Sequence, residues 1–313
     1  MMKKINRRNY PRLTLCVILL GVTSSIVSPT LFAQGGATGF DFLKLGIGGR
    51  NVAMADAGVV SSVGGASIHY NPANMLQQES AQIFFMHNSW VQDLSTEYIG
   101  ATVPFGDLAI GFHVNTTRVP DIEIRNVPGP PIGAFDARDL STGISAAVRL
   151  ANDVSIGITA KYILEKLYTE YIDGYAFDFG VRYQTTIPNL SAAVALANIG
   201  SMGELRNETI KLPTLIRIGA AYSYPVESIN GSILIEANAI DVFAEKKFHA
   251  HVGVEAAYEK SIFARLGYQQ GYETKSISAG IGAAYGQFLF DYGFTPFQND
   301  LGTSHTISFA YQL

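Results

Sequence analysis

The end of the chain alternates strictly between two kinds of side chain. Ile307, Phe309, Tyr311 and Leu313 lie on one face, and Thr306, Ser308, Ala310 and Gln312 lie on the other. A period of two residues is typical of a β-strand with two unlike faces. In a transmembrane β-barrel, lipid-facing side chains alternate with lumen-facing ones in this way. The pattern therefore predicts the closing strand of such a barrel.

Similar segments recur from residue 81 to the end of the chain, and we count fourteen. They span 81–90, 96–104, 107–117, 140–150, 153–167, 172–184, 189–198, 214–224, 231–240, 248–258, 261–269, 274–285, 287–295 and 304–313. An even number is expected of a bacterial barrel. The sequence thus predicts an all-β fold, a 14-stranded antiparallel transmembrane β-barrel over 81–313. The alternative is a soluble β-sandwich.

Residues 1–33 have the three parts of a secretory signal peptide. A basic start (Lys3 to Arg12) precedes an apolar stretch from Leu13 to Val27, and Leu31-Phe32-Ala33 forms a cleavage site. We therefore expect export by a cleavable signal peptide to the outer membrane of a Gram-negative cell. A membrane-anchor helix is the weaker alternative, because the apolar stretch is short and contains serine and threonine.

Charge and cysteine content exclude several classes of protein. Without residues 1–33 the chain keeps 17 of its 22 lysines and arginines against 26 acidic residues. Nucleic acid is not expected as a partner of so acidic a chain. The single cysteine, Cys16, lies within the signal peptide, so no disulfide framework is expected.

The joints between the predicted strands are alternately short and long, as in barrels whose short turns are periplasmic. The longer joints, assigned to the cell exterior, are 118–139, 199–213, 241–247 and 296–303. The joint 118–139 is rich in proline and unusually apolar for a loop. It either binds a partner or packs back over the mouth of the barrel.

The segment 34–80 precedes the first strand and is rich in glycine, alanine and serine. Gly46 to Ala57 is compatible with one or two helical turns. We expect this segment to fold inside the lumen as a plug, or else to be a periplasmic tail. Asn71-Pro72-Ala73 has the composition of a turn, and its expected task is to fix the plug. The alternative is that Asn71 touches a ligand.

Three short motifs of this segment resemble the N-terminal signature of the PorV/PorQ proteins, which are similar to the FadL-like outer-membrane barrels. The motifs are Phe42-Leu43-Lys44-Leu45-Gly46-Ile47-Gly48-Gly49-Arg50, Ala53-Met54-Ala55-Asp56-Ala57 and Tyr70-Asn71-Pro72-Ala73. Ala55 and Asn74 depart from the pattern, which has glycine at both positions.

The resemblance implies a FadL-like barrel with an N-terminal segment in its lumen. It also implies a role in type IX protein secretion or cell-surface attachment. The expected partners are then outer-membrane lipid, secreted proteins with C-terminal signal domains and other secretion-system components. The alternative is FadL-like transport of hydrophobic compounds such as long-chain fatty acids through the barrel wall. A purely structural barrel is a third hypothesis.

Charged residues on the face opposite the apolar one should line the lumen. The predicted binding residues are Asn71, Pro72 and Ala73 of the plug motif, with Asp178, Arg182, Arg217, Glu236, Glu255 and Asp291 as a polar network. The network either holds wall and plug together or lines a solute path. Lys161 lies on the same face.

We predict neither an enzyme nor a bound cofactor. His249 and His251 project to one side of a strand with Glu255 further along, but no third ligand supports a metal site. No spacing of serine, histidine and aspartate singles out a catalytic triad. Gly46-Ile47-Gly48-Gly49 lacks the lysine and serine of a phosphate-binding loop.

Overall fold

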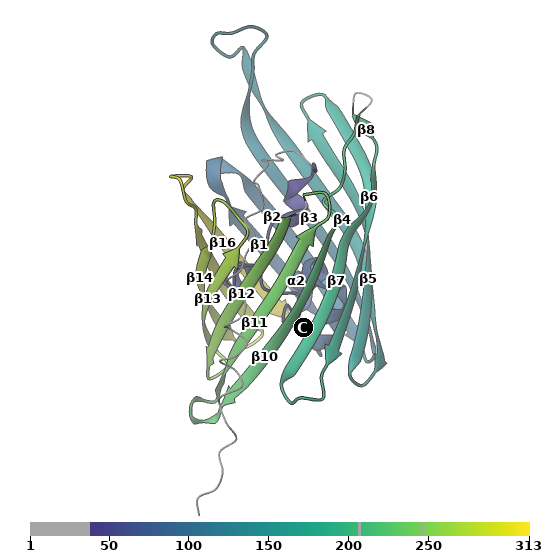
Figure 1. Ribbon diagram of the computed structural model, residues 1–313, viewed down its shortest axis with the longest axis vertical. Coiled ribbons are helices and arrows are strands. Elements are labelled where there is room, and N and C mark those ends of the chain that lie inside the picture. The colour runs from purple at the N-terminus through teal and green to yellow at the C-terminus, as the bar shows by residue number, and fades with distance from the viewer. Residues whose placement is uncertain (1–37, 206–207, 246) are drawn as a thin grey trace, which may run out of the picture. The chain divides into compact units, whose positions relative to one another are not determined.

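The structure is a computed structural model that describes residues 38–205, 208–245 and 247–313. The predicted signal peptide lies outside these residues. Fourteen strands form one closed antiparallel barrel, in which β1 pairs with both β2 and β16 (Figure 1). The predicted fold class is therefore confirmed.

The barrel strands are β1 (Gln82–Ser89), β2 (Ser95–Phe105), β3 (Leu108–Ile124), β4 (Gly133–Ala151), β5 (Val154–Leu167), β6 (Glu170–Gln184), β7 (Leu190–Met202), β10 (Leu215–Val226), β11 (Gly231–Val242), β12 (Lys247–Tyr258), β13 (Ile262–Gln270), β14 (Ile277–Tyr285), β15 (Phe288–Pro296) and β16 (Thr303–Gln312).

The two faces of the strands differ as the alternation predicts. On β16, Ser304, Thr306 and Ser308 are buried, whereas Ile307 between them is exposed. Large apolar side chains face outward on every strand of the wall. Such an apolar outer surface is typical of a barrel wall that faces the hydrocarbon of a bilayer. Within the described residues, no helix combines the length and apolar character that a membrane-spanning helix needs.

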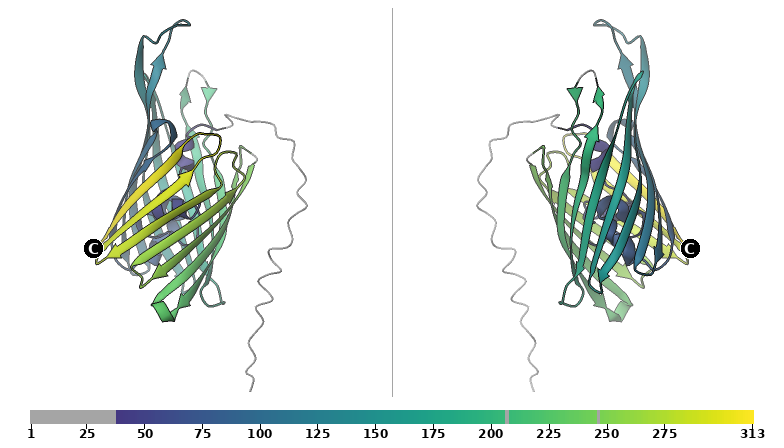
Figure 2. Two further views of the ribbon diagram at one scale, coloured as in Figure 1. Left: turned by 90° about the vertical axis from the view of Figure 1, so that its left-hand side faces the viewer. Right: turned by 90° about the vertical axis from the view of Figure 1, so that its right-hand side faces the viewer.

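Two of the predicted exterior joints contain strand structure. The joint 118–139 is largely an extension of β3 and β4, whose turn occupies only 125–132. Beyond Arg118 and Arg138 these two strands pair only with each other. The resulting hairpin rises away from the barrel end and does not fold over it (Figures 1 and 2). The prediction of a loop over 118–139 was therefore wrong. The thickness of the lipid limits the length of the apolar part of a strand, but two strands can continue to pair beyond the membrane.

The joint 199–213 also differs from the prediction. Strand β7 continues to Met202, and β8 (Glu204–Leu205) and β9 (Glu208–Thr209) then form a separate two-stranded sheet. Two single-turn 3-10 helices, η4 (Val91–Asp93) and η5 (Glu227–Ile229), occupy the joints after β1 and β10.

The N-terminal segment contacts the inward face of the wall through four short helical elements. They are η2 (Asp41–Lys44), α1 (Gly49–Ala53), α2 (Gly64–Tyr70) and η3 (Pro72–Gln77). Helix α1 contacts β13 to β16, and η3 contacts β2 to β6. The helical turn expected between Gly46 and Ala57 is α1, whereas α2 was not predicted. The purple ribbon of this segment lies within the ring of strands in both views of Figure 2.

An arginine on the outward face at mid-strand should destabilise the barrel. Ile281 lies at the centre of β14 and is 63% exposed on the outward face. Ile281→Arg should cost ~2–4 kcal/mol, because the charge would face hydrocarbon. Urea-dependent folding into lipid vesicles measures this cost. Asn126→Arg, at the exposed hairpin tip, is the control, and an equal cost at both positions would contradict the assigned faces.

The sequence suggests that a lumen-facing position such as Ser278 would accept arginine more easily. The structure argues otherwise. The Ser278 hydroxyl donates to the carbonyl of Ala53 and accepts from the amide of Ala55, both at 2.9 Å. No space remains for a larger side chain where the N-terminal segment packs this closely against the wall.

Candidate functional site

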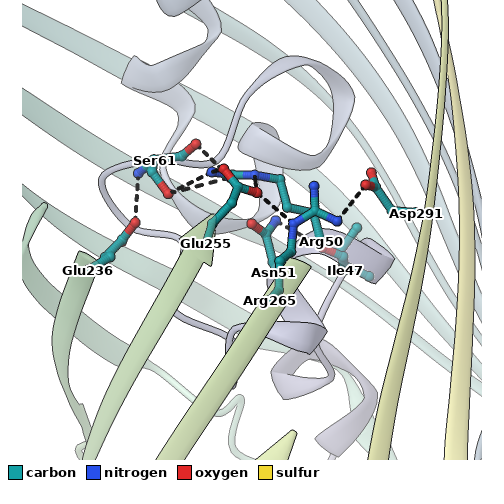
Figure 3. Close-up of polar contacts among 8 residues, drawn as sticks. All are labelled: Ile47, Arg50, Asn51, Ser61, Glu236, Glu255, Arg265 and Asp291. Atoms are coloured by element: carbon teal, nitrogen blue, oxygen red, sulfur yellow. Dashed lines mark hydrogen bonds and ion pairs between the residues drawn. The ribbon is translucent and has the colours of Figure 1, made fainter. Parts of the chain in front are cut away.

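An ionic chain links helix α1 to three wall strands, β12, β13 and β15 (Figure 3). Arg50 of α1 binds both carboxylate oxygens of Glu255 on β12, at 2.8 and 3.0 Å. Arg265 on β13 donates to the same carboxylate at 2.5 Å and to Asp291 on β15 at 2.7 Å. All four side chains are largely buried, so each charge is stabilised chiefly by its neighbours in the chain.

Glu236 on β11 holds a second part of the N-terminal segment. Its carboxylate accepts the backbone N–H groups of Val60 and Ser61, at 2.9 and 3.0 Å. Arg50 in turn donates to the carbonyl of Ser61 at 2.9 Å. The stretch around Ser61 is thus tied to the wall by one carboxylate and to α1 by one guanidinium (Figure 3).

Asn71-Pro72-Ala73 lies at the junction of α2 and η3. The Asn71 side chain accepts the amide of Ala73 at 3.0 Å and donates to the carbonyls of Val59 and Val181. A Cβ atom at Gly180 of β6 would collide with the Asn71 side-chain oxygen. The asparagine therefore joins two parts of the N-terminal segment to one wall strand, and a glycine in the wall makes the close approach possible.

The other predicted lumen residues do not form one network. Asp178 on β6 pairs with Lys161 on β5 at 2.8 Å. Arg182 donates to the hydroxyl of Ser191 at 2.9 Å. Arg217 belongs to neither group and lines a pocket. The single network predicted from the sequence is therefore divided, because register and strand separation decide which inward charges can meet.

A pocket of about 390 Å³ lies between the N-terminal segment and the ends of β10 to β14 that carry the longer joints. Its apolar side includes Leu215, Ile240 and Val242. Its aromatic side chains are Tyr70, Trp90 and Tyr272. Charged and imidazole side chains from both the segment and the wall complete the lining, among them Lys44, Asp56, His69, Arg217, Glu245, His249, His251 and Lys275.

Most charges in the pocket have a partner, but Arg217 does not. Lys44 pairs with Glu245, and Lys275 pairs with Asp56 at 3.6 Å. Arg217 is only 4% exposed and forms no ion pair with any residue that the structure describes. Its Nη1 donates to the carbonyl of His69 at 3.4 Å, and its Nε has no acceptor. A buried guanidinium in this state has N–H groups that are free to donate to an anionic group.

The groups nearest to Arg217 carry no negative charge, and the carboxylates of Asp178 and Asp56 attract its guanidinium only from beyond ion-pair distance. Its guanidinium carbon lies 5.7 Å from the centre of the Tyr70 ring. Burial and Asp56 raise the pKa of Tyr70 well above its usual range, so this phenol stays neutral. Burial and Arg217 itself lower the pKa of His69 well below its usual range. Both groups are therefore uncharged at neutral pH.

Tyr272 organises the opposite side of the pocket. Its ring stacks on His249 with 4.1 Å between centroids, and its hydroxyl lies 2.9 Å from Nε2 of His251. The ammonium of Lys275 lies 4.7 Å from the centre of the same ring. No group of three metal-ligating side chains occurs among the described residues. His249 and His251 therefore position the Tyr272 ring, which together with Lys275 forms this side of the pocket.

The geometry defines a class of protein: a closed transmembrane barrel with its N-terminal segment in contact with the lumen face. Solved structures of this class superpose on the chain. The toluene transporter TbuX of Ralstonia pickettii gives a TM-score of 0.59 at 14% identity, covering 86% of this chain and 98% of that one. The CymD monoaromatic hydrocarbon channel gives 0.60 at 13% identity, with the same coverage.

A FadL homologue of Pseudomonas aeruginosa gives a TM-score of 0.52 at 10% identity, covering 84% of this chain and 98% of that one. No family model and no curated protein sequence matches the chain. At such low identity the likeness establishes the fold, which is that of the FadL-like 14-stranded barrels. TbuX is described as a transporter and CymD as a channel.

Several functional residues were not singled out from the sequence. Arg50 lay within the signature motif but had no assigned partner, and Arg265 was not among the predicted lumen residues. Tyr272 lay in the joint between the predicted strands 261–269 and 274–285 and was not singled out. Period-two alternation could have found Arg265, because it occupies an inward position of β13 between outward Ala264 and Leu266.

Neutralising Glu255 should loosen the N-terminal segment. Glu255→Gln would leave the buried guanidinium groups of Arg50 and Arg265 facing one another without their shared carboxylate. We expect a loss of ~3–5 kcal/mol in the free energy of unfolding. Unfolding in lipid vesicles measures this loss, and planar-bilayer conductance should rise if the segment leaves the lumen.

Asp107→Asn is the matched control, because Asp107 forms its 3.1 Å ion pair with Arg149 at an exposed turn. An exposed pair contributes about 0–1 kcal/mol. Equal losses for the two variants, with unchanged conductance, would mean that the ionic chain does not secure the segment.

Proposed function

We propose that the protein is an outer-membrane channel that takes up small organic molecules with an apolar body. The single observation that carries this proposal is the 390 Å³ pocket, which combines an apolar side with the unpaired Arg217. Its volume lies within the usual range for small-molecule sites of about 300–1,000 Å³. The toluene transporter and the monoaromatic hydrocarbon channel that share the fold support a transport role.

The lining of the pocket narrows the class of ligand. Leu215, Ile240 and Val242 suit an apolar body, and Tyr272 can stack on an aromatic ring. Arg217 would receive a carboxylate through a bidentate, charge-assisted hydrogen bond. The favoured ligand is therefore an amphipathic organic acid, a class that includes the long-chain fatty acids of the FadL hypothesis.

A second cavity of only about 10 Å³ shares the lining residues Arg217 and His69 with the pocket. It is also lined by Lys161, Asp178 and Asn198. Beside it the β6–β7 register shifts between Phe177 and Phe179, and the amide of Asn198 donates to the Asp178 carboxylate. The ionic chain of Arg50 holds the N-terminal segment in the direct path through the lumen. The irregular β6–β7 pairing therefore supports a route for the ligand toward the barrel wall.

Substitution of Arg217 tests the proposed ligand class. Arg217→Gln should reduce uptake of benzoate by about tenfold or more, because one charge-assisted contact is lost. Uptake of toluene should stay unchanged, since it has no anionic group. Proteoliposomes with each compound added outside give both uptake rates after subtraction of the rate into protein-free liposomes. The heat-dependent gel mobility of each variant reports barrel folding.

Lys260→Gln, which removes a cation from the exposed turn between β12 and β13, is the control. Equal benzoate uptake by wild type and Arg217→Gln would reject the role of Arg217. Failure of the wild type to take up either compound would reject the channel itself.

Protein secretion is the second candidate function, and the β3–β4 hairpin favours it. The hairpin projects from the exterior end of the barrel, and Val127 and Ile132 at its tip are exposed. Among the described residues, no strand pairs with either outer edge of the projecting strands, and such edges can pair with an extended segment of another protein. This agrees with the PorV/PorQ resemblance of the N-terminal motifs.

Shortening the hairpin separates the two functions. Replacing 119–137 by Asn-Gly removes the projecting strands, and should join the paired residues Arg118 and Arg138 by a two-residue turn and leave the barrel intact. A channel should keep its uptake rate after this change. A secretion component should instead lose export of cargo with C-terminal signal domains, measured as the amount of cargo at the cell surface. A deletion strain with unchanged secretion and lost uptake would reject the secretion role.

A further inference from the structure

Cations are distributed unevenly over the two faces of the wall. Most lysines and arginines of the described strands face the lumen, including Lys161, Arg217 and Arg265. Those that face outward in the described strands are Arg118, Arg138 and Lys166. Outward charge is costly wherever lipid covers the wall, so its position carries information.

These three cations form one row across three neighbouring strands. Arg118 of β3 lies opposite Arg138 of β4, and Arg138 lies opposite Lys166 of β5. Side chains directly opposite on one face lie ~4.5–5.5 Å apart at Cβ, and like charges in such pairs destabilise a sheet. The row therefore requires anions to offset its charge.

The protein supplies only part of this compensation. Arg118 pairs with Asp136, also on the outward face, at 2.8 Å. The side chains of Arg138 and Lys166 form no ion pair or hydrogen bond with any residue in the described part of the chain, and Asp136, which pairs with Arg118, attracts Arg138 only at longer range. Two cations of the row are thus left for an external anion.

The row marks the exterior edge of the lipid-facing wall. Arg118 is the last residue of β3 that pairs with β2, and Arg138 is the last residue of β4 that pairs with β5 toward the exterior. A barrel strand crosses the hydrocarbon in ~9–11 residues, and Arg138 is twelve residues from outward Leu150 near the opposite end of β4. Tyr171 of β6, opposite Lys166, is 73% exposed, as expected of an aromatic ring at headgroup level.

An apolar groove lies on the same outer face, toward the periplasmic end. It has a volume of about 570 Å³ and runs over β2 to β5, where Ala101, Ala146 and Ala160 lie among larger side chains. Ile144 and Ala146 in the groove follow Arg138 by six and eight residues, which is ~20–26 Å along the strand. This distance suits an acyl chain whose headgroup lies at the row.

We propose that the row formed by Arg118, Arg138 and Lys166 binds the phosphate groups of a glycolipid in the outer leaflet, with an acyl chain in the groove below. Guanidinium groups bind phosphate oxygens bidentately, and a bridging phosphate would offset the repulsion within the row. The site is independent of what passes through the lumen.

Native mass spectrometry of the purified full chain tests the proposal. The lipid probe is a diphosphorylated glycolipid, compared with its dephosphorylated form and with inorganic phosphate. Arg138→Gln/Lys166→Gln removes the two unpaired cations. Lys211→Gln/Lys260→Gln removes the same charge from exposed positions outside the row and is the matched control.

We expect the Arg138→Gln/Lys166→Gln variant to retain the diphosphorylated lipid about tenfold less than the wild type does, since charge-assisted contacts are lost. The control should match the wild type, and the dephosphorylated lipid should bind all three proteins equally. An equal loss in the control would overturn the site, as would equal retention by all proteins. Displacement of the lipid by millimolar inorganic phosphate would overturn the role of the groove. Gel mobility before and after heating confirms that each variant is folded.

Discussion

Closure of the sheet is the constraint on which the rest of the structure depends. In lipid no water can pair with free backbone N–H and C=O groups, so the first and last strands must pair with each other. Strand β1 does this along its whole length, from Gln82 opposite Gln312 to Ser89 opposite His305. The alternating C-terminal strand is therefore the element that completes the barrel, and its outward Phe309 and inward Ser308 follow from its position between β1 and β15.

Closure also fixes what the inward face must contain. A barrel of this kind buries its inward charges between wall and N-terminal segment, where desolvation is costly unless each charge is paired. The chain from Arg50 through Glu255 and Arg265 to Asp291 meets this condition with alternating signs. The same contacts that compensate the charges also hold the segment, so the electrostatics and the position of the segment have one origin.

The sequence allowed the fold to be predicted more fully than the site. Period two identifies all fourteen strands because lipid demands apolar side chains at every second position, whatever lies opposite. It also gives the type of inward residue, but not its partner. Arg265 and Asp291 meet across β14 because Gly282 leaves room between them, and a Cβ there would collide with both side chains. This ion pair depends on the separation of β13 and β15, on their register and on the missing side chain of Gly282. No local sequence pattern encodes these three conditions together.

The rule that buried or opposed charges need partners leaves two places where the residues that the structure describes do not supply an ion pair. Arg217 lies inside, beside Tyr70 and a pocket with an apolar side. Arg138 and Lys166 lie outside, above an apolar groove. In both places a cation adjoins apolar surface, so each favours an anion attached to an apolar body. The inner cation faces a bounded pocket, which suits a molecule that passes through, whereas the outer pair faces the bilayer, which suits a lipid that stays.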